Sequence, residues 1–150
     1  MGRIMGIDFG RRRCGVAVTD PLRIVATALQ TVDTAALPAF VAAYCAGEPV
    51  DFIVAGLPRD LRGNESESMR FIRPAMARLR KAVPDMEIVM WDERFTSAIA
   101  HRSMIDSGMS RTQRRDKALA DRMAAVLILN SFLESRQYAD MQRGSLPPMP

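Results

Sequence analysis

Cysteine is scarce in this 150-residue chain, and long apolar runs are missing from it. The two cysteines, Cys14 and Cys45, have no metal-ligand spacing and are too few to indicate a secreted disulfide scaffold. No stretch approaches the roughly 18 apolar residues that a membrane span needs, and an acid and glycines interrupt the N-terminus before any signal-like segment develops. We therefore expect a cytoplasmic protein that is neither inserted into a membrane nor exported.

Lysine and histidine are scarce as well. Only Lys81 and Lys117 are lysines among the 21 basic residues, so the other 19 are arginines, and the net charge is +4. The planar guanidinium of arginine can donate two hydrogen bonds to one phosphate, which favours a nucleic-acid partner. A compositional bias toward arginine would give the same count. His101, the single histidine, is expected to be a surface residue rather than a proton shuttle.

The hydrophobic residues, 48% of the chain, are enough for one core. Their pattern predicts strands over 4–9, 15–19, 24–32, 52–57 and 87–91, and helices over 34–46, 69–83, 96–108 and 118–136. Short turns make the first three strands an antiparallel meander, whereas a helix joins the last two and makes them parallel. This order predicts an α/β domain of the RNase H-like fold over residues 1–136, with a mixed five-stranded sheet flanked by helices.

Two details of this plan involve proline. Pro74 lies inside the second predicted helix and should kink or split it, because a proline in a helix interior costs about 3 kcal/mol. Residues 137–150 contain Pro147, Pro148 and Pro150 and are expected to form a flexible tail.

Three acidic positions are candidates for chemistry. Asp8 ends the first strand between Gly6 and Gly10, where a bulky anionic ligand could approach the backbone, although aspartate is also common in ordinary turns. Asp92 and Glu93 follow the last strand and should emerge at the same edge. Side chains alternate along a strand, so only one of these two is expected to be a direct ligand. The alternative to a metal site is that these acids precede a helix, whose dipole favours negative charge at its N-terminus.

Asp121 is the third candidate. It shares a helical stripe with Ala125, Ile128 and Phe132, on a helix that is apolar nearly all round. A carboxylate on such a stripe needs a positive partner. That partner is either a shared metal ion or a neighbouring basic side chain, Arg122 or Lys117.

Three carboxylates held together repel one another unless cations lie between them. Oxygen ligands favour Mg²⁺ or Mn²⁺, and such a site can activate water for in-line displacement at a phosphodiester. Arginines in the loops would then hold backbone phosphates, and all except those of the first hairpin are expected near the acidic edge. The candidates are Arg11, Arg12, Arg59, Arg62, Arg94, Arg111, Arg114 and Arg115. Taken singly, each could equally be a solvated loop charge.

Five ordered motifs carry a family resemblance. They are Gly6-Ile7-Asp8-Phe9-Gly10, Gly15-Val16-Ala17-Val18-Thr19-Asp20-Pro21, Gly56-Leu57-Pro58, Trp91-Asp92-Glu93-Arg94-Phe95-Thr96 and the run from Asp121 to Leu129. Together they resemble the YqgF (RuvX) family, a bacterial RNase H-like group related to the RuvC Holliday-junction resolvases. The resemblance covers roughly residues 4 to 136.

The resemblance implies a nuclease linked to maturation of the 5′ end of precursor 16S rRNA, and hence to ribosome biogenesis. Its acids would be Asp8, Asp92 or Glu93, and Asp121. RuvC-type enzymes carry their second acid after the fourth strand, where this chain has Gly56-Leu57-Pro58, so the replacement would come from the fifth strand. We choose Glu93 and keep Asp92 as the alternative ligand.

Other interpretations stay open on the sequence alone. A Holliday-junction resolvase-like DNA endonuclease and a non-catalytic RNA-binding module for ribosome assembly are the alternatives. The Asp-x-Gly strand also opens sugar kinases and actin-like ATPases, but those enzymes need a second such domain. Structured RNA is the preferred partner, with branched DNA and pre-ribosomal particles as further candidates, and both a monomer and a homodimer are compatible with the sequence.

Overall fold

The computed structural model describes residues 2–57, 67–92 and 117–145. Five strands form one mixed sheet in the order β3-β2-β1-β4-β5. Their bounds are β1 Arg3–Asp8, β2 Arg13–Thr19, β3 Ala26–Asp33, β4 Val50–Leu57 and β5 Glu87–Asp92. β1, β2 and β3 pair antiparallel, whereas β4 runs parallel to both β1 and β5. The predicted sheet, a meander followed by two parallel strands, is confirmed.

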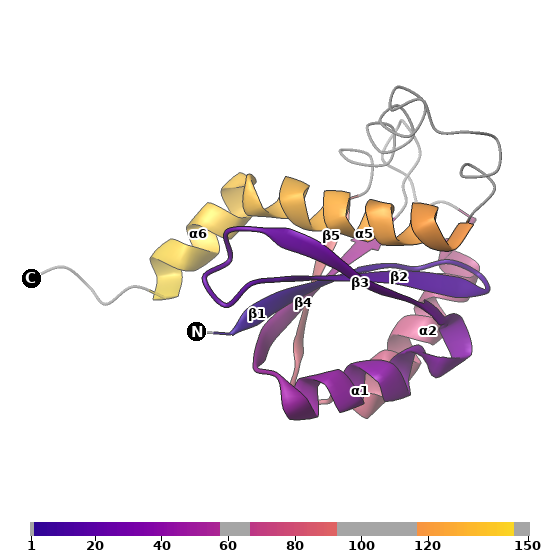
Figure 1. Cartoon of the computed structure of the whole chain (residues 1–150). Helices are drawn as coiled ribbons and strands as arrows, with labels where there is room; N and C mark the ends of the chain where they lie inside the picture. Colours follow the sequence, from indigo (N-terminus) through magenta and orange to yellow (C-terminus); the bar gives the residue numbers. More distant parts are fainter. Residues whose placement is uncertain (1, 58–66, 93–116, 146–150) are drawn as a thin grey trace, which may run out of the picture.

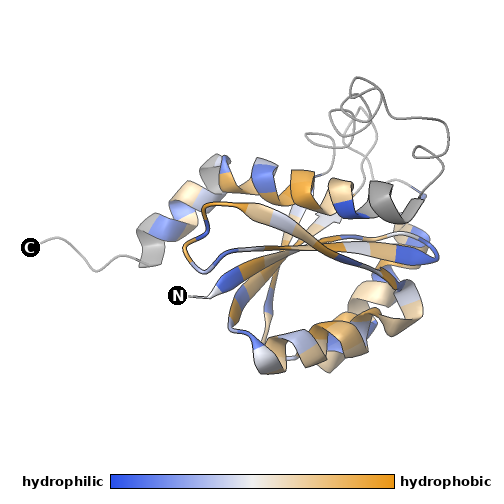
Figure 2. Ribbon diagram, in the orientation of Figure 1, coloured by the Kyte–Doolittle hydropathy of each residue, from blue (hydrophilic) through white to orange (hydrophobic). Residues whose placement is uncertain are grey.

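Helices cover both faces of the sheet (Figure 1). A 3₁₀ turn over Thr34–Ala36 leads into α1, Leu37–Gly47, and α1 lies with α2, Met69–Ala82, on one face. α5, Lys117–Leu133, packs across β1, β2 and β3 on the other face and is followed by α6, Arg136–Ser145. Figure 2 places hydrophobic residues along the strands and on the helices of both layers. None of the helices in the described part of the chain is long and apolar enough to cross a membrane.

The sheet separates two cores, and alternate residues of each strand supply them. Met5, Ile7 and Ile53 face α1 and α2, whereas Ile4 and Val54 belong to the core under α5. α5 contributes fully or almost fully buried side chains at Ala125, Ile128, Leu129 and Phe132. The apolar stripe predicted for this helix is confirmed at its three apolar members.

Two helices differ from the sequence-based expectation, since the second is not split at Pro74 and a further helix follows α5. α2 continues without interruption through Pro74, because Ile72, Ala75, Met76 and Leu79 are all buried and hold both halves of the helix against the sheet. Pro74 itself is exposed, so its missing N–H leaves only one solvent-side backbone group without its helical bond.

Residues 137–145, the first part of the expected flexible tail, belong to a helix, because α6 extends to Ser145. The Ser135 hydroxyl accepts a hydrogen bond from the Tyr138 backbone N–H at 3.1 Å, as an N-cap does. The Tyr138 ring is buried against Phe132, with the ring centroids 5.5 Å apart. This aromatic contact anchors α6 to the core under α5.

The amino edge of the sheet is held by polar contacts. The Asp20 carboxylate accepts hydrogen bonds from the backbone N–H groups of Leu22, Ile24 and Val25 at 3.2, 2.7 and 2.8 Å. These bonds, the one from Val25 foremost, hold the pKa of Asp20 below its usual range. The Thr19 hydroxyl, fully buried, accepts a hydrogen bond from the Ile4 N–H at 2.9 Å. In the Thr19-Asp20-Pro21 motif these two side chains therefore organise the turn after β2.

Candidate active site at the carboxyl edge of the sheet

Asp8 is the last residue of β1 and is half-buried. Asp8 is paired with Gly15 on β2 and with Gly56 on β4, so the residues directly opposite it on both neighbouring strands are glycines. Residues paired in this way point to the same face of a sheet, and glycine offers no side chain to fill the space beside the carboxylate. The structure thereby gives Gly15 and Gly56 a role that sequence reasoning missed, for which the signal was a glycine inside an apolar strand.

Gly6 fixes the face on which Asp8 lies. A Cβ at Gly6 would stand 2.5 Å from Leu129 Cγ and 3.2 Å from the carbonyl oxygen of Ala125, so α5 contacts the backbone of β1 directly. Asp8 is two residues further along the strand, and alternation places it on the same face. Only glycine at position 6 permits this close approach of helix to strand.

α5 runs antiparallel to β1, which determines which end of the helix approaches Asp8. Ile4, at the start of β1, shares a core with Phe132, whereas Gly6 contacts Ala125 and Leu129. Moving along β1 toward Asp8 therefore means moving along α5 toward its N-terminus (Figure 1). Asp121 belongs to α5 one turn before Ala125, and its side chain lies outside what the structure describes.

Asp92 ends β5 and lies on the other face of the sheet. It is paired with Leu57, which packs against the core under α1 and α2. Trp91, one residue earlier, is on the face of Asp8, and its ring meets Phe132 edge-on with the centroids 5.6 Å apart. Trp91 is half-buried against this core.

The hairpin that follows Asp8 is at the same edge of the sheet, contrary to the expectation that its arginines lie elsewhere. The reason is that β1 ends at Asp8, so the turn to β2 begins there. A Cβ at Gly10 would stand 2.1 Å from the Arg13 carbonyl oxygen, so the turn is tight enough to require glycine. Thr34 directly follows β3, and its hydroxyl donates a hydrogen bond to the Gly10 carbonyl oxygen at 2.8 Å, which fixes the turn.

Arg11 and Arg12 of this hairpin are both exposed. The Arg11 guanidinium lies 5.5 Å from the centroid of the Phe71 ring on α2, a cation–π contact. The hairpin and the start of α2 therefore form one basic surface beside Asp8.

The remaining predicted site residues fall outside the described ranges. They are Glu93, Arg59, Arg62, Arg94, Arg111, Arg114 and Arg115, together with His101 and the predicted helix over 96–108. Within the described residues there is no group of three or more His, Cys, Asp or Glu side chains able to hold a metal ion. Glu93 and the Asp121 side chain lie outside these residues, so the three-carboxylate site stays a prediction.

Comparison with known proteins gives consistent matches. A family model described as "RuvX: Holliday junction resolvase" matches residues 2–135. Proteins named "Putative pre-16S rRNA nuclease" are similar along nearly their whole length. The one from Phocaeicola vulgatus is 47% identical over 92% of this chain and 99% of its own, and the one from Porphyromonas gingivalis is 49% identical over 90% and 98%.

Solved structures support the fold. The RuvC of Thermus thermophilus in complex with a Holliday junction substrate aligns with a TM-score of 0.58 and 16% identity, covering 99% of this chain and 100% of that one. A second Thermus thermophilus RuvC structure aligns with a TM-score of 0.55 and 15% identity, covering 98% and 99%. At such low identity this similarity concerns the RNase H-like fold alone.

Proposed function

The chain belongs to the RuvX family, and from this premise we propose that it is a metal-dependent nuclease that processes the 5′ end of precursor 16S rRNA. One observation carries the proposal. A half-buried carboxylate, Asp8, ends the central strand between two glycines, on the face that α5 covers. The choice of RNA is supported by the printed names of the relatives from Phocaeicola vulgatus and Porphyromonas gingivalis.

The proposed ligands are Asp8, Glu93 and Asp121, which offer the hard oxygen donors that Mg²⁺ or Mn²⁺ prefers. The antiparallel packing of α5 on β1 favours Asp121, because the helix position one turn before Ala125 is displaced toward Asp8. The pairing of Asp92 with Leu57 favours Glu93, because alternation along an extended chain assigns successive side chains to opposite faces. The residues present therefore fit a divalent cation.

When bound, such a cation would supply an activated water molecule and stabilise the leaving oxygen of the phosphodiester. The chain's own residues position the carboxylates and hold the RNA backbone. Asp8 is held in place by strand pairing on both sides, and the tight packing at Gly6 fixes the helix that bears Asp121. Exposed Arg11 and Arg12 lie at the same edge, where they would hold phosphates next to the scissile bond. The reaction would take place in the cytoplasm, on precursor RNA or on pre-ribosomal particles.

The test is a cleavage assay with purified protein. We expect wild type with Mg²⁺ or Mn²⁺ to shorten the 5′ end of precursor 16S rRNA. Asp8→Asn, Glu93→Gln and Asp121→Asn should each lower the rate at least 100-fold, because removing one charged group from a metal site typically costs several kcal/mol of transition-state stabilisation. Asp85→Asn is the matched control, since Asp85 is exposed and precedes β5 at the opposite edge of the sheet.

Parallel reactions on a four-way DNA junction distinguish the second candidate, which the printed description of the matching family model favours. Cleavage of the junction and not of the RNA would replace the proposed substrate with branched DNA. Full cleavage by all three carboxylate variants would reject the site. Inactivity of wild type on both substrates, with RNA binding retained, would instead indicate a non-catalytic assembly module.

A further inference from the structure

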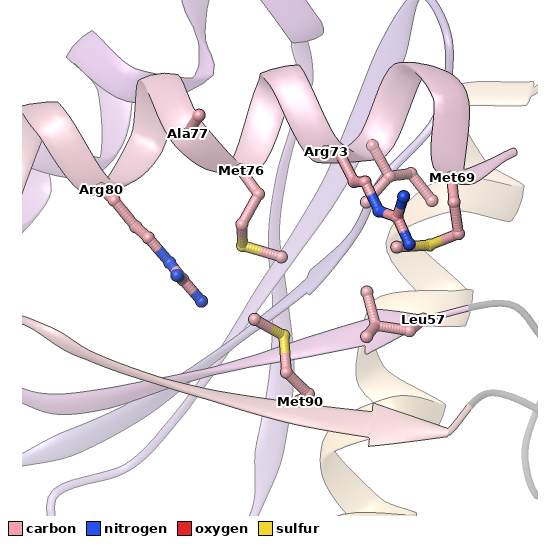
Figure 3. A pocket seen from close by; sticks show the side chains of 8 residues that line it. Leu57, Met69, Arg73, Met76, Ala77, Arg80 and Met90 are labelled. Atoms are coloured by element: carbon pink, nitrogen blue, oxygen red, sulfur yellow. The ribbon is translucent and has the colours of Figure 1, made fainter. Parts of the chain in front are cut away.

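A pocket of about 300 Å³ lies between α2 and the edge strand β5. Its apolar lining includes Leu57, Met69, Met76 and Met90, and Figure 3 shows Met76 and Met90 pointing toward each other across it. Met90 is 37% exposed, so this wall of the pocket is open to solvent. The size and lining are those of a site that can take one flat apolar group.

Two arginines flank this opening. Arg73 and Arg80 line the pocket from α2 on either side of Met76, with Arg73 beside Met69 and Arg80 pointing toward the strand that bears Met90 (Figure 3). They are seven residues apart, about 10 Å along a helix. A guanidinium on each side of an apolar opening suits a ligand that is flat in the middle and anionic at both ends.

The charge of α2 identifies the class of ligand. The helix carries Arg70, Arg73, Arg78, Arg80 and Lys81 and no acidic residue, and all five are exposed. The helix dipole accounts for basic residues in the last turn, but it opposes those in the first half, such as Arg70 and Arg73. Like charges three residues apart also repel each other. A polyanion bound along the helix would offset both costs.

The pocket begins at the catalytic edge of the sheet. Leu57, at one end of the pocket, is paired with Asp92. The Arg11 guanidinium, from the hairpin after Asp8, lies over the Phe71 ring on α2. Basic side chains therefore extend from the hairpin next to Asp8 along α2 to Arg80. Asp8 lies on the α5 face and the pocket on the α2 face, so an RNA strand held at Asp8 would reach the pocket by passing round the carboxyl edge of the sheet at this hairpin.

We propose that this pocket, lined by Met76 and Met90 and flanked by Arg73 and Arg80, binds one unstacked base of a single-stranded RNA segment beside the cleavage point. The arginines hold the phosphates on either side of that base. Sequence-dependent RNA recognition commonly uses bases turned out of the stack, and polarisable methionine sulfur packs well on aromatic rings. The inference rests on the proposed function, because it extends the binding of the RNA substrate away from Asp8.

A second copy of the chain is the rival occupant, since β5 is the edge strand of the sheet among the described residues. A symmetric contact through this face would bring one basic α2 against another. The repulsion between two helices that each carry five positive charges opposes that contact. Charge therefore favours RNA over self-association.

The test measures binding separately from cleavage. All variants are made on an Asp8→Asn background, and fluorescence anisotropy follows a labelled 12-nucleotide single-stranded RNA. We expect Arg80→Gln and Met90→Phe, which fills the pocket without a change of charge, each to weaken binding five- to tenfold. Arg78→Gln is the matched control, because it removes the same charge from the same helix outside the pocket, and it should change the affinity less than twofold.

Salt dependence separates the two parts of the pocket. Arg80→Gln should reduce the slope of log affinity against log salt by about 0.7, the contribution of one phosphate contact on a single strand, whereas Met90→Phe should leave the slope unchanged. Equal losses in Arg80→Gln and Arg78→Gln would overturn the proposal, because binding would then be general attraction to α2. A change of molecular mass in Met90→Phe, measured by light scattering, would also overturn it in favour of a second copy.

The experiments distinguish a wrong assignment of the pocket from a wrong assignment of the nuclease function. If wild type cleaves RNA and the pocket variants bind and cleave as it does, the pocket assignment is wrong and the nuclease stands. If wild type binds RNA with the expected pocket effects and cleaves nothing, the nuclease is wrong and the pocket stands. Circular dichroism melts of each variant exclude loss of folding as the cause.

Discussion

The contact between Gly6 and α5 allows the most quantitative prediction. In Gly6→Ala the new methyl carbon would lie 2.5 Å from Leu129 Cγ, whereas apolar carbons normally meet at about 4 Å. The helix or the Leu129 side chain must therefore move by roughly 1.5 Å. Overpacking of this kind costs about 1–3 kcal/mol of unfolding free energy. The expected loss for Gly6→Ala alone is about 2 kcal/mol.

A double-mutant cycle isolates the contact. Leu129 is fully buried, so Leu129→Ala alone should cost about 3 kcal/mol, but it also removes the atom that Gly6→Ala would meet. The double variant should therefore cost about 3–4 kcal/mol instead of the 5 kcal/mol expected from independent sites. The remaining approach to the Ala125 carbonyl oxygen, 3.2 Å, limits the rescue.

Urea unfolding of the four proteins measures the cycle. Gly47→Ala is the control, because a Cβ at Gly47 meets nothing within 4 Å. It should change stability by less than about 1 kcal/mol. Effects of Gly6→Ala and Leu129→Ala that add to within about 0.5 kcal/mol would refute the direct contact of α5 with β1, and with it the argument that this contact positions Asp121.

Two further predictions concern the amino edge and α6. Asp20→Asn should lower the melting temperature at pH 7, because it weakens the acceptor of three backbone hydrogen bonds. The pKa of Asp20 is lowered on folding, so its stabilisation is complete above the ordinary value of 3.8 and is lost as the pH falls through the lower folded value. The difference in melting temperature between the two proteins should therefore shrink as the pH falls below 3.8, and a difference that does not change with pH would contradict this cause. Tyr138→Ala should cost about 3 kcal/mol in urea unfolding, because the ring is buried against Phe132. An unchanged midpoint would mean that α6 does not pack on the core.

The sheet was predictable from the sequence because its order depends on the chain's strongest signals. Continuous apolar runs such as 52–57 occur only where a strand is buried on both faces, and the structure has cores on both sides of β4. The place of Asp8 at the carboxyl end of β1 was predictable for a similar reason, because the apolar strand pattern ends at this acid. The stripe through Ala125 and Phe132 likewise indicated the buried face of α5.

The parts that were missed depend on contacts between residues far apart in sequence. Pro74 stays within α2 because the burial of the apolar residues around it stabilises the helix more than one lost hydrogen bond destabilises it. Helix propensity alone does not include this packing energy. α6 is a polar helix that is anchored by Tyr138 against Phe132 and by Met141 against the same core. The glycines beside Asp8 acquire their meaning only through strand register, which places Gly15 and Gly56 in the same row.

The central claim is that Asp8 belongs to a metal-dependent catalytic centre for RNA cleavage. The most direct test compares the initial rates at which Asp8→Asn and Asp85→Asn shorten the 5′ end of precursor 16S rRNA in the presence of Mg²⁺. The account predicts a loss of at least 100-fold for Asp8→Asn and a rate within about twofold of wild type for Asp85→Asn. Equal rates for the two variants would contradict it.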